Sequence, residues 1–382
     1  MLLLPPLSLY IHVPWCVRKC PYCDFNSHQA NGDLPEDAYV DALLADLDAD
    51  RHWVQEREIR SIFIGGGTPS LLSAAAYQRL FDGLKKRLTF AHDIEITLEA
   101  NPGTFEADKF AAYRKLGINR LSMGIQSFND DHLKALGRIH DTAQAQKAIK
   151  AANKAGFDNF NLDLMYGLPG QTVEQALADL KTALSFNPPH LSWYQLTIEP
   201  NTEFYKYPPK LPQDDDLWDI QEAGLALLAE HGFEHYEISA HARPGKTARH
   251  NVNYWQFGDY LGIGAGAHGK ITLADAHVIL RTQKTRMPKD YLNPDKAFLS
   301  GKQSIEPEDI GLECLMNALR LRDGMAVEDF EARTGLRLEH VAEPIAKAQQ
   351  LGLLNVDRRI YATEKGQQYL NELLALFLTD EE

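Results

Sequence analysis

Strand-like and helix-like segments alternate through the first 200 residues, and this alternation leaves few folds open to the chain. Apolar runs of strand length recur, and the stretches between them carry apolar residues at helical spacing. Strands are expected at residues 7–13, 60–64, 94–99, 120–124, 159–165 and 191–197. Helices are expected at residues 36–56, 74–88, 106–116, 142–155 and 173–186. Parallel strands joined by helices form a sheet wrapped by helices, so we predict an α/β fold with a partial (β/α)6 barrel.

The second half of the chain has a different character. A helix is expected at 217–231 and a strand at 234–240, after which Gly, His, Asn and aromatic residues become frequent. The last eighty residues predict helices at 308–321, 327–334, 338–351 and 367–377, with a hairpin at 353–363. We therefore predict a barrel over residues 1–240, a linker or cover region over 241–300, and a C-terminal small helical, winged-helix-like domain over 301–382.

The charge balance narrows the range of partners. The 382 residues include 39 Lys and Arg against 53 Asp and Glu, which gives a net charge of −14. An acidic surface disfavours phosphate backbones, so we expect no nucleic-acid partner and a packing or docking role for the winged-helix-like domain. No apolar run of about 18 residues predicts a transmembrane segment, and the first residues do not resemble a signal peptide. A cytoplasmic location is therefore expected.

Three cysteines lie close together in the sequence. Cys16, Cys20 and Cys23 have the spacing C-x3-C-x2-C after the first expected strand, whereas the fourth cysteine is almost 300 residues away. This is no disulfide framework, and neighbouring thiolates in a reducing compartment usually bind soft metal. Three thiolates suit a four-iron cluster with one iron open to an outside ligand. A Cys3His zinc site that includes His12 or His28 is the alternative.

Polar and glycine-rich segments follow the expected strands at the end where such folds place their active sites. The segment GGGTP, residues 65–69, follows the second strand, and Glu99 ends the third. Gln126 follows the fourth strand, Asp163 ends the fifth, and Arg138 lies in the segment LGRIH. Each residue alone is more often structural, but together on one rim they predict one site.

The cysteine spacing after the first strand of a partial barrel resembles the radical S-adenosylmethionine (SAM) superfamily. In that superfamily a TIM-like barrel holds a [4Fe-4S] cluster, and SAM binds the open iron. The segments YIHVPWC (10–16), GGGTP (65–69), SMGIQSF (122–128) and DLMYGLPGQT (163–172) are similar to the oxygen-independent coproporphyrinogen III oxidase group. The resemblance runs from about residue 5 to the C-terminus and implies that Cys16, Cys20 and Cys23 bind the cluster. The SAM-binding positions that it implies are Tyr10, Tyr22, Gly66, Gly67, Thr68, Glu99, Gln126, Arg138 and Asp163.

The chain departs from the oxidase pattern in two respects. Phe25 stands where the oxidase has a further cysteine, and the sequence starts at the first strand without the longer N-terminal region. Both features match the sister family of HemW heme chaperones. The segment HNVNYW, residues 250–255, is similar to the heme-associated HNxxYW motif of that family. Because imidazole is a good axial ligand for heme iron, the resemblance implies that His250 binds heme. His268 is a second candidate.

Other residues near this motif are expected to complete a heme site. Tyr254, Trp255 and Phe257 are candidates for packing against the porphyrin faces, because aromatic rings offer flat apolar surfaces. Arg243 and Arg249 are candidates for pairing with the propionates.

Three functions are compared on these grounds. The first is a heme chaperone that binds heme and hands it to apo heme proteins, including membrane cytochromes of the respiratory chain, which implies peripheral membrane contact through partners. The cluster and SAM would then support structure, homodimer formation or transfer. The alternative is an oxygen-independent coproporphyrinogen III dehydrogenase, a radical SAM decarboxylase in which the cofactor performs the difficult step. A metal-stabilised interaction protein ranks last.

Overall fold

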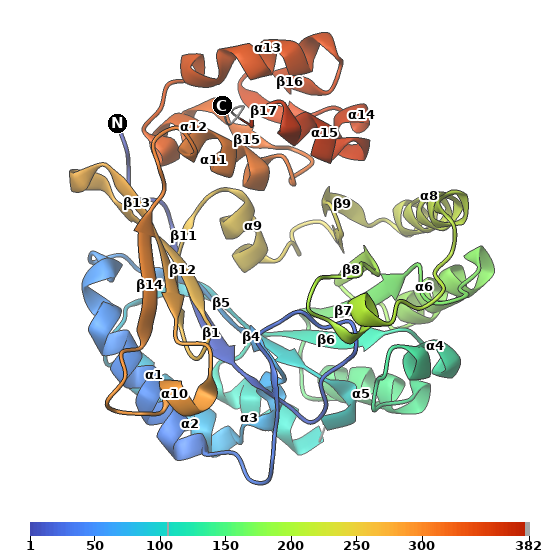
Figure 1. The fold of residues 1–382 in the computed structure, drawn as a ribbon. Coiled ribbons are helices and arrows are strands. Elements are labelled where there is room, and N and C mark those ends of the chain that lie inside the picture. Colours follow the sequence, from blue (N-terminus) through green and yellow to red (C-terminus); the bar gives the residue numbers. More distant parts are fainter. Residues whose placement is uncertain (105–106, 379–382) are drawn as a thin grey trace.

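A curved sheet forms the body of the protein (Figure 1). The computed structural model describes residues 1–104 and 107–378. Within these residues one sheet has the strand order β14-β13-β12-β11-β1-β4-β5-β6-β7-β8-β10-β9. Its centre is parallel and comprises β1 (Leu7–Val13), β4 (Ile59–Gly66), β5 (Phe90–Ala100), β6 (Arg120–Gln126), β7 (Phe160–Tyr166) and β8 (His190–Gln195). All six predicted strands are confirmed, and so is the partial (β/α)6 barrel.

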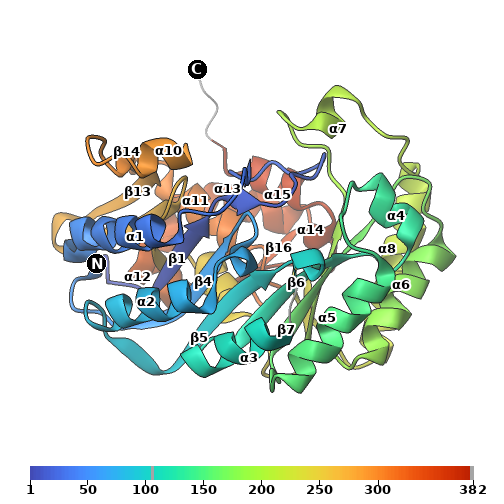
Figure 2. The same ribbon diagram turned by 90° about the horizontal axis from the view of Figure 1, so that it is seen from below.

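Helices cover the outer face of this sheet (Figure 2). They are α1 (Glu36–Asp50), α2 (Ala74–Lys85), α3 (Ala107–Leu116), α4 (Asp130–Ala135), α5 (Thr142–Lys154) and α6 (Val173–Ser185). The five predicted helices are confirmed, although residue 106 lies outside the described residues. Two of them begin at capping boxes, in which Asp141 pairs with Gln144 and Thr172 pairs with Gln175. The cap residue bonds an otherwise unpaired N–H of the first turn, which fixes where each helix starts.

The segment expected to be a linker or cover in fact extends the sheet. It contains α9 (Arg249–Trp255), β11 (Asp259–Ile263), β12 (His268–Leu273), β13 (Val278–Lys284), α10 (Pro288–Tyr291) and β14 (Leu299–Ser304). Strand β11 pairs in parallel with β1, and the next three strands follow antiparallel. The glycines permit close strand contact here, since a Cβ at Gly262 would lie 2.0 Å from the carbonyl oxygen of His268. Without these strands β1, whose two faces are buried, would be an open edge.

The other edge of the sheet carries shorter elements. They are α7 (Glu203–Lys206), α8 (Asp214–Glu230), β9 (Glu234–Glu237) and β10 (Ala240–Ala242). The single strand expected at 234–240 is therefore two short antiparallel strands, which turn between Glu237 and Ala240. The predicted helix at 217–231 is confirmed as α8, which starts three residues earlier.

The C-terminal part is the predicted winged-helix-like unit. It contains α11 (Ile310–Ala318), β15 (Met325–Ala326), α12 (Val327–Thr334), α13 (Ala342–Gln350), β16 (Leu354–Val356), β17 (Arg359–Ala362), α14 (Glu364–Gln368) and α15 (Leu370–Ala375). Its strands form a small sheet in the order β15-β17-β16. Its apolar core also takes in Leu2, Phe257 and Ile279 from outside the unit. In Figure 1 it lies above the concave side of the large sheet, with α9 between the two.

No helix in residues 1–104 or 107–378 is long and apolar enough to cross a membrane.

Candidate functional site

The three clustered cysteines lie in one loop that is closed by a short strand pair. Strands β2 (Trp15–Cys16) and β3 (His28–Gln29) pair in parallel at the two ends of the loop. Cys16 is buried, whereas Cys20 and Cys23 are half-buried, and none of them forms a disulfide. All three line a cavity of about 340 Å³. The three predicted cluster ligands thus line one cavity, while Cys314 lies apart, buried on α11 against Met325.

The glycine-rich segment after β4 lines the same cavity and is tied to the cysteine loop. The backbone N–H of Gly67 donates to the carbonyl oxygen of Val13, and that of Thr68 donates to Trp15, both at 2.7 Å. Gly66 has φ +114°, and a Cβ there would lie 2.6 Å from the His12 ring. A side chain is therefore excluded at Gly66, and the backbone there borders the cavity directly.

Two carboxyl groups from neighbouring regions of the sheet face this cavity. Glu99 on β5 accepts a hydrogen bond of 3.1 Å from the backbone N–H of Gly66, and Asp163 lies on β7. Burial and the nearby charge of Asp163 raise the pKa of Glu99 to about 8. Burial also raises the pKa of Asp163, against hydrogen bonds from Ser122 and Asn161. Half-buried carboxyl groups with raised pKa values at a cavity indicate a candidate ligand-binding site.

Arg138 connects the cysteine loop to the sheet. Its guanidinium donates to Cys20 Sγ and to the Tyr22 hydroxyl at 3.5 Å, to Asn101 Oδ1 at 2.6 Å and to the carbonyl oxygen of Gly124 at 2.7 Å. Arg138 thus places a cation beside Cys20, one of the three predicted cluster ligands. Sequence reasoning missed Asn101, although it lies two residues after Glu99 in the same strand-end segment.

Gln126 also lies at this cavity, but its backbone is unusual. It has φ +70°, a left-handed conformation that is uncommon for residues other than glycine. Its side-chain oxygen accepts a 2.9 Å hydrogen bond from the hydroxyl of Tyr194 on β8. Eight of the nine SAM-binding positions implied by the sequence thus line this cavity, and Tyr10 does not.

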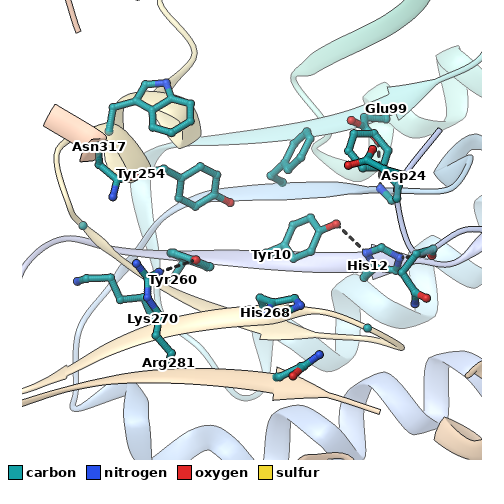
Figure 3. Close-up of a pocket in the computed structure, with 18 of the residues that line it drawn as sticks. Tyr10, His12, Asp24, Glu99, Tyr254, Tyr260, His268, Lys270, Arg281 and Asn317 are labelled. Carbon is teal, nitrogen blue, oxygen red and sulfur yellow. Dashed lines mark hydrogen bonds between the residues drawn. The ribbon is translucent and has the colours of Figure 1, made fainter. Parts of the chain in front are cut away.

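Tyr10 lines a second and larger cavity of about 690 Å³ (Figure 3). The two cavities share Phe25, Gly66, Glu99 and Trp255 among their lining residues and therefore adjoin. Aromatic side chains dominate the walls of the larger one, from Tyr10, Phe63, Tyr254, Trp255, Phe257 and Tyr260. Phe25, which replaces the oxidase's further cysteine, is 60% exposed at this boundary.

His250 lies behind the wall of the larger cavity. Its ring is buried and stacks on Phe63 at 4.3 Å between centroids, and it does not line either cavity. Its Nδ1–H donates to Glu95 Oε1 at 3.0 Å. Burial would raise the pKa of Glu95, but this hydrogen bond and the charge of Arg120 lower it to about 2. Burial lowers the pKa of His250 itself, although the hydrogen bond and charge of Glu95 act in the opposite direction.

Comparison with known proteins places the chain in a family. Residues 10–183 match the radical SAM superfamily, and residues 305–369 match the HemN C-terminal domain. The heme chaperone HemW of Escherichia coli is 53% identical over 381 residues, covering 100% of both chains. HemW of Haemophilus influenzae is 53% identical and covers 99% of both, and HemW of Bacillus subtilis is 34% identical over 97% of this chain. The chain belongs to the HemW family.

A solved structure agrees with this assignment. The E. coli coproporphyrinogen III oxidase HemN, described as a radical SAM enzyme, superposes with a TM-score of 0.82 at 27% identity. The match covers 98% of this chain and 90% of HemN. This chain thus shares the radical SAM fold with the oxidase over nearly its full length.

The residues of this HemW-family chain fit the cluster and SAM that its fold implies. Three free thiols, a half-buried arginine beside them and a glycine backbone surround one cavity. Of the two imidazoles considered for a zinc site, His12 has both ring nitrogens in hydrogen bonds, whereas among the described residues His28 has only Nε2 in one. His12 bonds to Tyr10 and to the carbonyl oxygen of Asn26, and His28 bonds to the side chain of Asn26.

Proposed function

We propose that this protein is a heme chaperone, which binds heme and transfers it to apo heme proteins, including respiratory cytochromes. Its relatives carry the name heme chaperone HemW at up to 53% identity over the whole chain. The observation that carries the proposal is the pair of adjoining cavities. The smaller one has the donor set for a cluster, and the larger one has the aromatic walls that suit a flat apolar ligand.

The cluster and SAM are assigned to the smaller cavity in this proposal. Cys16, Cys20 and Cys23 would ligate the [4Fe-4S] cluster, and Arg138 would hold their loop. The backbone of Gly66 and Gly67 would border the ligand, as would the side chains of Tyr22, Thr68, Glu99, Gln126 and Asp163. Tyr10 would contribute from the adjoining cavity. When bound, a cluster with SAM supplies one-electron chemistry.

The three free thiols also indicate the cellular compartment of the protein. A site built on three free thiols requires reducing conditions, so we propose a cytoplasmic protein that reaches membrane cytochromes through partners. We also propose that the protein forms a homodimer. Sedimentation of the cluster-loaded protein with and without heme would measure it.

Coproporphyrinogen III dehydrogenase activity is the second candidate, and the superposition on HemN favours it. Phe25 opposes it, since this residue stands where the oxidase sequence has a cysteine and lies at the boundary of both cavities. A phenyl ring cannot replace a thiol in ligation or redox chemistry.

One experiment separates the two functions. Anaerobically reconstituted protein is titrated with heme and followed by its Soret band, and a parallel sample receives SAM, reductant and coproporphyrinogen III. We expect saturation near one heme per chain, transfer of that heme to an apo cytochrome, and no decarboxylated product. Turnover of the porphyrinogen without saturable heme binding would instead establish the second candidate.

A further inference from the structure

The larger cavity has one wall made by two strands of the extended sheet. His268 and Lys270 point from the same face of β12, and their partners on β13 are Gln283 and Arg281. Figure 3 shows His268 and Arg281 on this side, with Tyr254 and Tyr260 around the same cavity. The wall thus combines an imidazole with cationic side chains and faces aromatic rings.

The side-chain nitrogen atoms that line this cavity differ in whether hydrogen bonds already occupy them. His12 uses both ring nitrogens, with Nδ1 bonded to the Tyr10 hydroxyl at 2.7 Å and Nε2 bonded to the carbonyl oxygen of Asn26 at 2.9 Å. Lys270 donates to Asp259 and to the carbonyl oxygen of Phe257. His268 is exposed, and among the described residues no hydrogen bond reaches its ring. Of the cavity's two imidazoles, His268 is the one with free nitrogens.

His250 helps to hold helix α9 against the sheet. One carboxylate, Glu95 on β5, accepts bonds from the backbone N–H groups of Arg249 and His250 and from the His250 ring. These contacts fasten the start of α9 to the sheet. Trp255 on α9 then lines both cavities, and Tyr254 lines the larger one. His250 is thus suited to be a positioning residue for the aromatic wall.

The arginine side chains near the cavity also differ in whether they already have a partner. Arg281 already pairs with Glu313 and donates to the Tyr260 hydroxyl. Arg249 pairs with Asp93, and Arg243 donates to the carbonyl oxygen of His231. Arg286 is exposed at the cavity, and no described group pairs with its guanidinium. An unpaired guanidinium is well suited to bind a carboxylate through two parallel hydrogen bonds.

We propose that His268 is the axial ligand of the heme iron in the larger cavity and that Arg286 binds a heme propionate. This inference rests on the proposed function and specifies its site. Iron–imidazole binding uses the lone pair of a neutral ring. His250, by contrast, acts through α9.

The test is a heme titration of the full-length, cluster-reconstituted protein and three variants. His268→Ala is expected to weaken binding at least about tenfold, which corresponds to about 1.4 kcal/mol, and to change the spin state seen by EPR. Added imidazole should restore the spectrum. His250→Gln keeps a donor for Glu95 and should retain the wild-type spectrum. His92→Ala, an exposed histidine on β5 that lines neither cavity, is the matched control.

The propionate contact has its own test. Arg286→Ala should weaken the binding of heme and leave the binding of heme dimethyl ester unchanged, because the ester has no carboxylate charge. Equal weakening of both ligands would overturn that contact.

The outcomes distinguish the assignment of the iron ligand from the proposed heme-chaperone function. Wild-type affinity and spectrum in His268→Ala would overturn the ligand assignment, and loss of the spectrum in His250→Gln would then assign the iron to His250. Absence of saturable heme binding in the unmodified protein would overturn the proposed function itself. Circular dichroism of each variant verifies its fold. Because His268 is exposed, its replacement by alanine should leave the stability of the fold nearly unchanged.

Discussion

Glu99 shows how a single half-buried side chain makes stability depend on pH. Its pKa is about 8 in the folded chain, against an ordinary value of 4.5. The folded state therefore holds the proton more tightly, and the free energy of unfolding falls as the pH rises from about 4.5 to about 8. Glu99→Gln removes this loss. Above pH 8 we expect the variant to be more stable than the unmodified protein by at least about 1.4 kcal/mol, the equivalent of one pKa unit.

The measurement is urea unfolding of the cluster-free chain from pH 5 to pH 9, expressed as the difference between variant and unmodified protein. Glu58→Gln, whose side chain is 49% exposed, is the control and should give a flat difference. A flat difference for Glu99→Gln as well would contradict the expectation.

Arg138 is expected to matter for retention of iron. Its guanidinium contacts Cys20 and Tyr22 in the cysteine loop and Asn101 beyond it. Groups that hold metal ligands in place are commonly worth about 10- to 100-fold in metal affinity. Arg138→Ala should therefore lose iron to a chelator at least about tenfold more readily. Arg18→Ala removes an exposed cation from the same cavity and should keep its iron. Equal retention of iron in both variants would contradict this role of Arg138.

At the scale of elements, helix α9 depends on a contact made by one distant strand. Glu95 on β5 binds the backbone of Arg249 and the ring of His250. Glu95→Ala leaves these buried donors without a partner, which costs about 1–3 kcal/mol for such groups. We expect a lower free energy of unfolding and faster hydrogen exchange over residues 249–255. Heme binding should weaken as well, since α9 carries Tyr254 and Trp255.

The neighbouring carboxylate offers a matched control for α9. Asp93 pairs with Arg249 on the surface, where both side chains are more than half exposed. Surface ion pairs contribute little, so Asp93→Ala should leave exchange over 249–255 near that of the unmodified protein. If both variants gave the same exchange pattern, Glu95 would have no special role in holding the helix.

At the scale of the whole molecule, the C-terminal unit and the sheet are expected to unfold together. Leu2, Phe257 and Ile279 lie in the apolar core of that unit, and Arg320 covers the Trp255 ring at 4.3 Å. A shared core predicts a single calorimetric transition. Phe257→Ala should lower the stability by about 3–5 kcal/mol. Phe25→Ala, at an exposed ring, should change it by less than about 0.5 kcal/mol. Two well-separated transitions in the unmodified protein would contradict this coupling.

The sequence by itself determined the elements whose signals are local. The strand at 7–13 and the helix at 327–334 have the predicted ends, because apolar spacing and the flanking residues act within a few positions along the chain. The cysteine spacing and the strand-end residues likewise predicted a common site, since the carboxyl ends of parallel strands meet at one rim. These features needed no knowledge of distant contacts.

Only the tertiary structure decided what distant partners do. Residues 241–300 lack a strong strand pattern, yet β11 joins the sheet because β1 needs a partner for its buried backbone. His250 has the sequence context of a heme ligand, but Glu95, which lies 155 positions earlier, turns its ring away from both cavities. The pairing of β12 with β13 instead presents His268 with free nitrogens. Hydrogen bonds between residues so far apart depend on how the elements pack, which local residue patterns do not encode.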